Sequence, residues 1–277
     1  MSYRDVLVYA DAGEAAPSRY AAAAAFAARF GGRLKGAFVL EPFLPPYMGP
    51  TYGAYLPAQV MQDMLAEHRA YVTKRAEAAR EAFEQAAANA GVASEWVVIE
   101  AEGPDSYMQH ARRADVVVHP ARGGLDAHGT PMGAADLAMG CGGPVLIVPD
   151  MVSDLKIGDR ILVAWNGTRE AARALRDAMP MLTEAGQVTV LIASPNGEGP
   201  EGVLQRHLED HGCKADVIVD RTRGEEADVL IRRHAQNLGA DVVVMGLYGH
   251  SRVRQAVLGG ASRGMLDQRT LPLFVSH

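Results

Sequence analysis

The sequence predicts an α/β protein built from two tandem, doubly wound parallel-sheet domains. Three observations carry this prediction: short apolar runs alternate with helical stretches, the alternation occurs twice, and one strand sequence is nearly repeated. Alternating strands and helices are typical of a parallel sheet covered by helices on both faces. The 277-residue chain also has the length expected for about two domains.

The internal repeat is clearest in two pairs of predicted strands. Residues 5–11 resemble residues 160–166, and residues 114–119 match residues 240–245 without a gap through Ala-Asp-Val-Val-Val. Such apolar runs are typical of buried parallel strands. The remaining predicted strands are 35–40, 95–99 and 144–148, then 187–193, 215–219 and 272–276. The predicted helices are 17–30, 59–89 and 105–113, then 169–182, 225–238 and 261–266.

A polar stretch near 149–158 separates the halves, and the predicted domains are therefore 1–150 and 158–277. The first domain carries an insert, 41–91, in which a Pro- and Tyr-rich loop precedes the long helical pattern. Edge strands tend to be paired or covered. We therefore expect the closing strands of the two domains to meet, so that the domains pack as an intramolecular pseudo-dimer. A further homodimer is compatible with the sequence.

The composition excludes several function classes. A formal net charge of −6 argues against a broad surface for nucleic acid or for an anionic membrane. The two cysteines, Cys141 and Cys213, are too few for a disulfide framework. The N-terminus does not have the pattern of a signal peptide, and no apolar run has the length of a membrane span. These features predict a cytoplasmic protein.

A glycine-rich segment follows the fourth predicted strand of the second half. Gly246 ends the strand, Gly249 follows, and Gly259 comes after nine more residues, just before the predicted helix 261–266. Ligands of open parallel sheets bind outside the carboxyl ends of the strands, where glycine lets the backbone approach them. The first N–H groups of a helix favour anions, and Ser262 adds a hydroxyl group. The segment therefore suits phosphate groups.

The chain resembles the universal stress protein family, whose nucleotide motif is Gly-x2-Gly-x9-Gly followed by Ser or Thr. The resemblance covers nearly all of both halves except the insert. It implies an adenine nucleotide alpha hydrolase-like, Rossmann-type fold, and an adenine nucleotide, ATP with or without Mg²⁺, bound in the second domain. The site residues that it implies are Ala164, Trp165, Asn166, Ile192, Met245, Gly246, Gly249, Gly259, Gly260, Ala261 and Ser262.

Two positions depart from the family pattern. Gly260 stands where the family has Ser or Thr, so one hydroxyl group is lost although a backbone N–H remains. Asn166 stands where the family commonly has Asp at the end of the first strand. Because an amide both donates and accepts hydrogen bonds, this change alters the preference for the base.

The first half has lost the motif. When the repeated strands are aligned, Pro120 falls on Gly246 and Asp136 falls on Ser262. Proline has no N–H group to offer, and a carboxylate repels phosphate. Although Asp11 retains the family's acid after the first strand, the first domain is not expected to bind ATP.

The resemblance to the universal stress protein family, together with these patterns, leaves three functions open. The first is a stress-response regulatory protein that binds ATP through its second domain without a dedicated catalytic cycle. The second is a slow ATP hydrolase, which would need a metal and a positioned water. The third is an interaction protein without a nucleotide, an alternative that Gly260 keeps open. We identify no catalytic residue and no metal ligand in the sequence.

Overall fold

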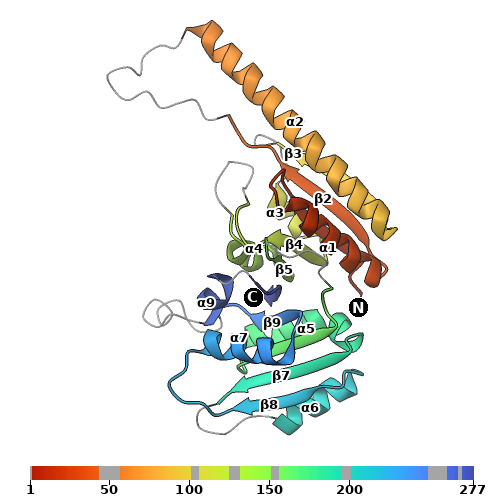
Figure 1. The fold of residues 1–277 in the computed structure, drawn as a ribbon, viewed down its shortest axis with the longest axis vertical. Helices are drawn as coiled ribbons and strands as arrows, with labels where there is room; N and C mark the ends of the chain where they lie inside the picture. Colours follow the sequence, from red (N-terminus) through yellow and green to blue (C-terminus); the bar gives the residue numbers. More distant parts are fainter. Residues whose placement is uncertain are drawn as a thin grey trace.

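The computed structural model describes residues 2–43, 57–100, 106–124, 132–150, 156–194, 201–248, 261–267 and 270–277. Strands and helices alternate through both halves of the chain, as the sequence predicts (Figure 1). In the first half the strands are β1 (Asp5–Ala10), β2 (Arg33–Val39), β3 (Ser94–Ile99), β4 (Val116–Pro120) and β5 (Val145–Val148). Its helices are α1 (Ala16–Arg29), α2 (Ala58–Ala90), α3 (Tyr107–Ala111) and α4 (Ala134–Cys141).

The second half repeats this order. Its strands are β6 (Arg160–Trp165), β7 (Gln187–Ala193), β8 (Asp216–Asp220), β9 (Val242–Gly246) and β10 (Leu273–Ser276). Its helices are α5 (Arg169–Thr183), α6 (Glu201–Asp210), α7 (Ala227–Leu238) and α9 (Ala261–Asp267). Each helix predicted from the sequence is present, although α3 is shorter than the expected 105–113.

All ten of these strands form one sheet with the order β3-β2-β1-β4-β5-β10-β9-β6-β7-β8. Within each half the neighbouring strands are parallel, whereas β5 and β10 pair antiparallel, with Phe274 opposite Leu146. Read outward from this pair, both halves have the same strand order. The predicted tandem, doubly wound fold is confirmed, and so is the contact between the closing strands. The domain bounds 1–150 and 158–277 stay a prediction.

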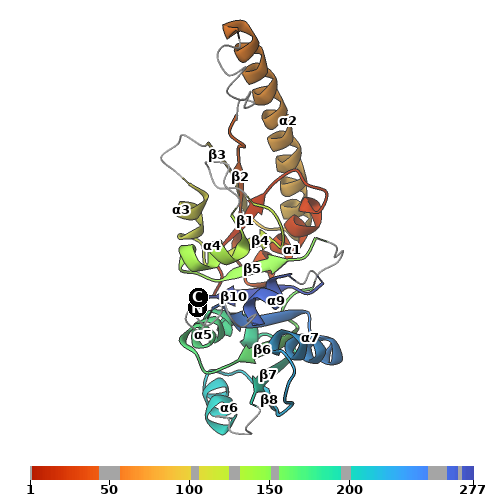
Figure 2. The ribbon, with the colours of Figure 1, turned by 90° about the vertical axis from the view of Figure 1, so that its left-hand side faces the viewer.

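Helices cover both faces of the sheet (Figure 2). One buried cluster joins residues of α1, α2, α5 and α6 to one face, and a second joins residues of α3, α4, α7 and α9 to the other. The alternation along each strand divides its side chains between the two clusters, because successive residues point to opposite faces.

Side chains tie the two halves together beside the central strand pair. Tyr3 donates from its hydroxyl to the carbonyl of Asp177 at 2.7 Å, and its ring packs 6.1 Å from that of Phe274. Arg29 donates to the carbonyls of Ile157 and Glu184 at 3.0 and 2.9 Å. The interface between the two halves thus contains both apolar contacts and hydrogen bonds.

The repeated Ala-Asp-Val-Val-Val segment has a structural role in each half. The Asp115 carboxylate accepts hydrogen bonds from the backbone N–H groups of Arg4 and Asp5, at 2.8 and 2.9 Å. The Asp241 carboxylate likewise accepts three hydrogen bonds of 2.8 to 2.9 Å from the backbone N–H groups of residues 158–160. In both halves this aspartate fixes the start of the first strand beside the start of the fourth.

Helix α2 is the largest difference between the halves. It has 33 residues and ends at Gly91, which has a left-handed φ of 67°. Its buried side chains lie between its middle and its C-terminal end: Val72, Ala76, Ala79, Phe83 and Ala87. The N-terminal half extends beyond the sheet in both ribbon views (Figures 1 and 2). Among the described helices, none is both long and apolar enough to cross a bilayer.

Candidate functional site

The candidate site lies where β6 and β9 end side by side. Strand order reverses at this pair, because β6 continues to β7 on one side and β9 to β10 on the other. Parallel sheets bind ligands in the crevice outside the carboxyl ends of the strands at such a switch point. Ala164 of β6 lies opposite Met245 of β9, and Trp165 lies opposite Ile192 of β7.

The predicted site residues near these strand ends fall into two groups. Ala164, Met245 and Ala261 belong to the cluster on the α7 and α9 face. Trp165 and Ile192 belong to the cluster on the α5 and α6 face. Successive strand residues point to opposite faces, so the side chains of Ala164 and Trp165 lie on opposite faces of the sheet.

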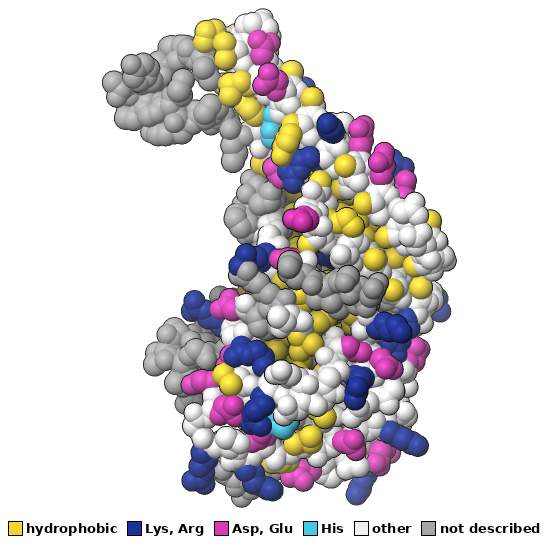
Figure 3. All heavy atoms as spheres, in the orientation of Figure 1, with side chains coloured by type: hydrophobic (Ala, Val, Ile, Leu, Met, Phe, Trp, Pro, Cys, Tyr) yellow, Lys and Arg dark blue, Asp and Glu magenta, His cyan; other side chains and the backbone are white. Residues whose placement is uncertain are grey.

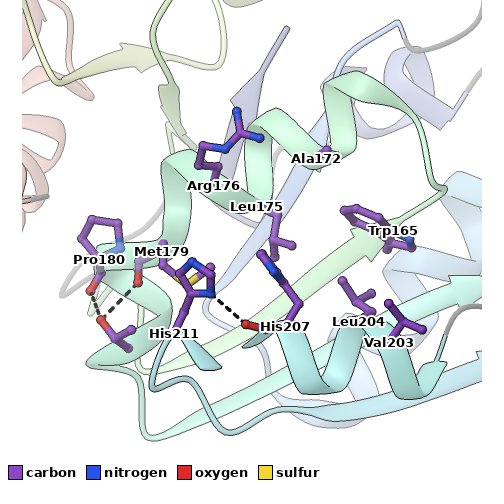
Figure 4. A pocket seen from close by; sticks show the side chains of 11 residues that line it. Trp165, Ala172, Leu175, Arg176, Met179, Pro180, Val203, Leu204, His207 and His211 are labelled. Carbon is purple, nitrogen blue, oxygen red and sulfur yellow. Dashed lines mark hydrogen bonds between the residues drawn. The ribbon is translucent and has the colours of Figure 1, made fainter. Parts of the chain in front are cut away.

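Trp165 lines a groove between α5 and α6 (Figure 4). Its indole nitrogen is buried and has no hydrogen-bond partner among the described residues. A buried N–H without an acceptor is costly, because it has lost its hydrogen bond to water.

Asn166 forms a tight turn between β6 and α5. Its side-chain oxygen accepts hydrogen bonds from the backbone N–H and the hydroxyl of Thr168, at 3.2 and 2.8 Å. Thr168 in turn caps α5 by accepting from the N–H of Ala171 at 3.3 Å. The turn occupies the Asn166 oxygen, and among the described residues none accepts a hydrogen bond from its amide NH₂ group.

Ser262 lies in the first turn of α9, and its side chain connects this helix to the end of β9. It is buried, and its hydroxyl oxygen accepts a hydrogen bond from the N–H of Tyr248 at 3.1 Å. Tyr248 has a left-handed φ of 56°, uncommon for a residue with a side chain. The predicted site residues Gly249, Gly259 and Gly260 lie outside the described residues.

Gly246 has a packing role that the sequence did not reveal. A Cβ atom added to it would lie 2.4 Å from the backbone N of Ala171 and from the backbone C of Glu170. The first turn of α5 therefore packs directly on the end of β9. Glu170 was also missed in the sequence analysis. It is only 3% exposed, and one of its carboxylate oxygens has no partner in the described part of the chain.

In the first half, the chain's own side chains occupy the corresponding places. The Asp136 carboxylate accepts from the N–H of Gly133, at the start of α4, at 3.3 Å. Asp11 pairs with Arg19, which is almost completely buried, and accepts from the N–H of Gly13 at 2.7 Å. The Asp136 carboxylate thus already accepts a hydrogen bond from the Gly133 N–H, at the position that corresponds to Gly259. The second half has Ser262 in place of this carboxylate.

His119 is fully buried at the end of β4, where the second half has Met245. Its Nδ1 donates to the carbonyl of Pro120 at 2.9 Å, and its Nε2 has no partner among the described residues. Burial lowers the pKa of His119 to about 4; the bond to Pro120 partly opposes this shift, and the positive charge of Arg19 adds to it. The ring is neutral at pH 7.

Because His119 is buried and neutral, we expect the unfolding free energy of the protein to fall in acid. Between about pH 6.5 and pH 4 the unfolded chain binds a proton at His119 that the folded chain does not, which removes up to about 3 kcal/mol of unfolding free energy. We expect His119→Met, which introduces the residue of the second half, to reduce this slope. Urea unfolding at pH 7.5, 5.5 and 4.5 measures it. Equal slopes for both proteins would contradict the assignment.

Comparison with known proteins supports the repeat and the fold. No protein-family model matches the sequence. Over 138 residues the chain is 25% identical to the universal stress protein Slr1230 of Synechocystis sp. (strain ATCC 27184 / PCC 6803 / Kazusa). This match covers 47% of the chain and 46% of the relative, so it spans about half of that protein.

Solved structures match over almost the whole length. A universal stress protein from Archaeoglobus fulgidus DSM 4304 superposes with a TM-score of 0.67, 17% identity and coverage of 98% of this chain and 96% of that chain. The chain shares the fold of this universal stress protein. A candidate family member from Pseudomonas aeruginosa UCBPP-PA14 superposes with a TM-score of 0.54, 17% identity and coverage of 99% and 93%. The likeness to these structures extends through both halves of the sheet.

Proposed function

We propose that this protein is a cytoplasmic stress-response regulator that binds an adenine nucleotide, ATP with or without Mg²⁺, in its second domain. It has no dedicated catalytic cycle in this proposal. The observation that carries the proposal is the contrast between corresponding positions at the two sheet edges. Ser262 places a neutral hydroxyl group where the first half has the Asp136 carboxylate.

The hydrogen bond of Ser262 supports this role. Its oxygen accepts from the N–H of Tyr248, so its own hydrogen is left to donate to another group. The same bond holds the chain after β9 against the first turn of α9. Phosphate oxygens are acceptors only, and they suit a hydroxyl donor beside the glycine motif.

Asn166 supports a contact with the nucleoside. Because its oxygen is engaged by Thr168, its NH₂ group is the part that can reach a ligand. Ring nitrogens of adenine and hydroxyl oxygens of ribose both accept hydrogen bonds. An aspartate in this turn, by contrast, would only accept.

The first domain is proposed to lack an ATP site. The Gly133 N–H, at the position corresponding to Gly259, already donates to the Asp136 carboxylate. A phosphate group placed there would meet this negative charge at close range and be repelled. One nucleotide per chain is therefore expected.

Calorimetric titration of ATP with magnesium into nucleotide-free protein tests the proposal. We expect about one equivalent to bind, and Gly259→Asp to weaken binding about 100-fold or more by placing a carboxylate in the phosphate site. The matched control is Gly133→Asp, which introduces the same charge at the repeat position. Aspartate is a favourable N-cap residue there, and binding should be unchanged.

Each other outcome points to a different function. Absence of binding together with absence of thermal stabilisation would contradict the proposal and support the nucleotide-free interaction protein. Two equivalents, one of them lost in Gly133→Asp, would contradict the assignment of the first domain. Linear ATP turnover that disappears in Gly259→Asp would support the slow hydrolase.

A further inference from the structure

Glu170, in the first turn of α5, is the one acidic residue among the buried residues of the described chain. On the face that Figure 3 shows, acidic side chains lie at the surface among those of lysine and arginine. The Arg169 guanidinium donates to Oε1 of the Glu170 carboxylate, whereas Oε2 has no hydrogen-bond partner in the described part of the chain. Burying a charged oxygen is costly unless it is paired or binds a metal ion, so Oε2 needs a donor or a cation.

This carboxylate is ionised at neutral pH. Burial raises the pKa of Glu170, but the hydrogen bonds that the carboxylate accepts from Arg169 and from its own backbone N–H lower it, and the pKa lies below its usual value. The Arg169 side chain is 85% exposed, so water screens most of its positive charge. The Glu170 carboxylate therefore keeps a negative charge that this surface ion pair compensates only in part.

Ser276, at the end of β10, is a second buried polar residue on the same side of the sheet. It is 1% exposed, and its hydroxyl group has no hydrogen-bond partner among the described residues. Phe274 belongs to the cluster on the α5 and α6 face, and the alternation along the strand places Ser276 on that face too. Ser276 lies opposite Gly246, where an added Cβ atom would collide with the backbone of Glu170. The two unpartnered groups thus belong to residues on either side of Gly246.

The first half has neither of these groups. The residues that align with Glu170, Gly246 and Ser276 have no side chain that donates or accepts a hydrogen bond: Ala15, Pro120 and Val148. The carboxylate and the hydroxyl group therefore occur together in the half that retains the glycine motif, next to the first glycine of that motif. This coincidence points to a role at the phosphate end of the nucleotide site.

A carboxylate oxygen and a hydroxyl oxygen are suitable ligands for a hard cation such as Mg²⁺. This ion keeps several waters and is usually held by one or two carboxylates together with the phosphate groups of a substrate. A Ser or Thr hydroxyl group binds it beside the phosphates in P-loop proteins. Among the residues that the structure describes, no group of three or more His, Cys, Asp or Glu is placed to hold a metal ion. A cation at Glu170 would therefore depend on the phosphate oxygens of a bound nucleotide.

We propose that Glu170 Oε2 and the Ser276 hydroxyl group bind the Mg²⁺ that accompanies ATP, beside the first glycine of the motif. The inference rests on the proposed nucleotide function and adds to it the protein ligands of the cation. The Glu170 carboxylate attracts a cation that is bound between it and the phosphate groups, whereas it repels the phosphate groups of metal-free ATP. Binding of ATP should therefore depend on the cation.

Calorimetric titration of ATP into nucleotide-free protein, once with Mg²⁺ and once with EDTA, tests the proposal. In the parent protein we expect Mg²⁺ to tighten ATP binding about tenfold or more. Glu170→Gln keeps the shape of the side chain but removes its charge. This variant should bind ATP with Mg²⁺ about tenfold more weakly than the parent, and metal-free ATP more tightly, because the repulsion is gone. Damage to the fold, by contrast, would weaken both.

Two further variants complete the test. Ser276→Ala should reduce the tightening by Mg²⁺ about threefold and leave the affinity for metal-free ATP unchanged. The control is Glu81→Gln on the exposed side of α2, which should leave both affinities unchanged.

The outcomes separate this inference from the proposed function. ATP binding that is equally tight with Mg²⁺ and with EDTA would overturn the cation site and leave the nucleotide site in place. The same holds if Glu170→Gln weakens both forms equally, or if Mg²⁺ tightens binding as much in this variant as in the parent. Absence of ATP binding under both conditions would overturn the proposed function and the cation site with it.

Discussion

Replacement of Gly246 by alanine is expected to destabilise the protein by about 3 kcal/mol or more. The added Cβ would lie 2.4 Å from backbone atoms of Glu170 and Ala171, far inside van der Waals contact. Backbone cannot rotate away as a flexible side chain can, so α5 must move as a unit. Since α5 also packs on β10, the shift would reach the central strand pair.

Urea unfolding monitored by circular dichroism measures this loss. The matched control is Gly202→Ala on α6, where an added Cβ meets no atom within 4 Å. Alanine is the better helix former, and this variant should be as stable as the parent or about 0.5–1 kcal/mol more stable. Equal midpoints for the parent and Gly246→Ala would show that α5 does not pack on β9 as described.

This expectation affects how the glycine motif is tested. Loss of nucleotide binding in a Gly246 variant would not distinguish a lost ligand contact from a displaced helix. Gly259 is the better position for the test, because its repeat counterpart Gly133 is a helix N-cap, where aspartate is favourable. A Gly246→Ala protein that bound ATP normally despite reduced stability would assign this glycine to packing alone.

Truncation of Phe83 to alanine is expected to cost about 3–5 kcal/mol of unfolding free energy. Phe83 is completely buried between α2 and the sheet, with ring centroids 5.9 Å from Tyr20 and 5.2 Å from Trp96. Its removal leaves a cavity lined by rigid aromatic and strand residues, which cannot close it. The contact holds the long helix of the insert on the first half.

Thermal and urea unfolding of the Phe83→Ala protein test this expectation. Glu81→Ala on the exposed side of the same helix is the control, and it should change stability by less than about 0.5 kcal/mol. A loss below about 1 kcal/mol for Phe83→Ala would mean that α2 is not firmly packed against α1 and β2. The comparison also shows how much stability a packed helix contributes where the second half has its groove.

Much of the fold was predictable from local patterns. The runs of buried residues that alternate with helical stretches predict β1–β5 and β6–β10, because parallel strands covered on both faces must be apolar throughout. The repeated Asp115 and Asp241 allow the halves to be aligned without a gap. The pairing of β5 with β10 followed from the need to cover two edge strands.

The candidate site was predicted less completely. Ala164 and Trp165 are neighbours in the sequence, but their side chains point to opposite faces of the sheet. Only the register with β7 and β9 shows which residues lie beside each of them. The hydrogen bond from Tyr248 to Ser262 joins residues 14 positions apart, and spacing alone does not reveal it.

Sequence patterns predict the order of the elements, the internal repeat and the position of the glycine motif, because these depend on the period and identity of residues close together in the chain. Three features become visible only in three dimensions: Gly246 packs against α5, the Asp136 carboxylate accepts a hydrogen bond from the Gly133 N–H, and a groove lies between α5 and α6. These features depend on how far apart separate elements come to lie, and that distance is set by packing over the whole sheet.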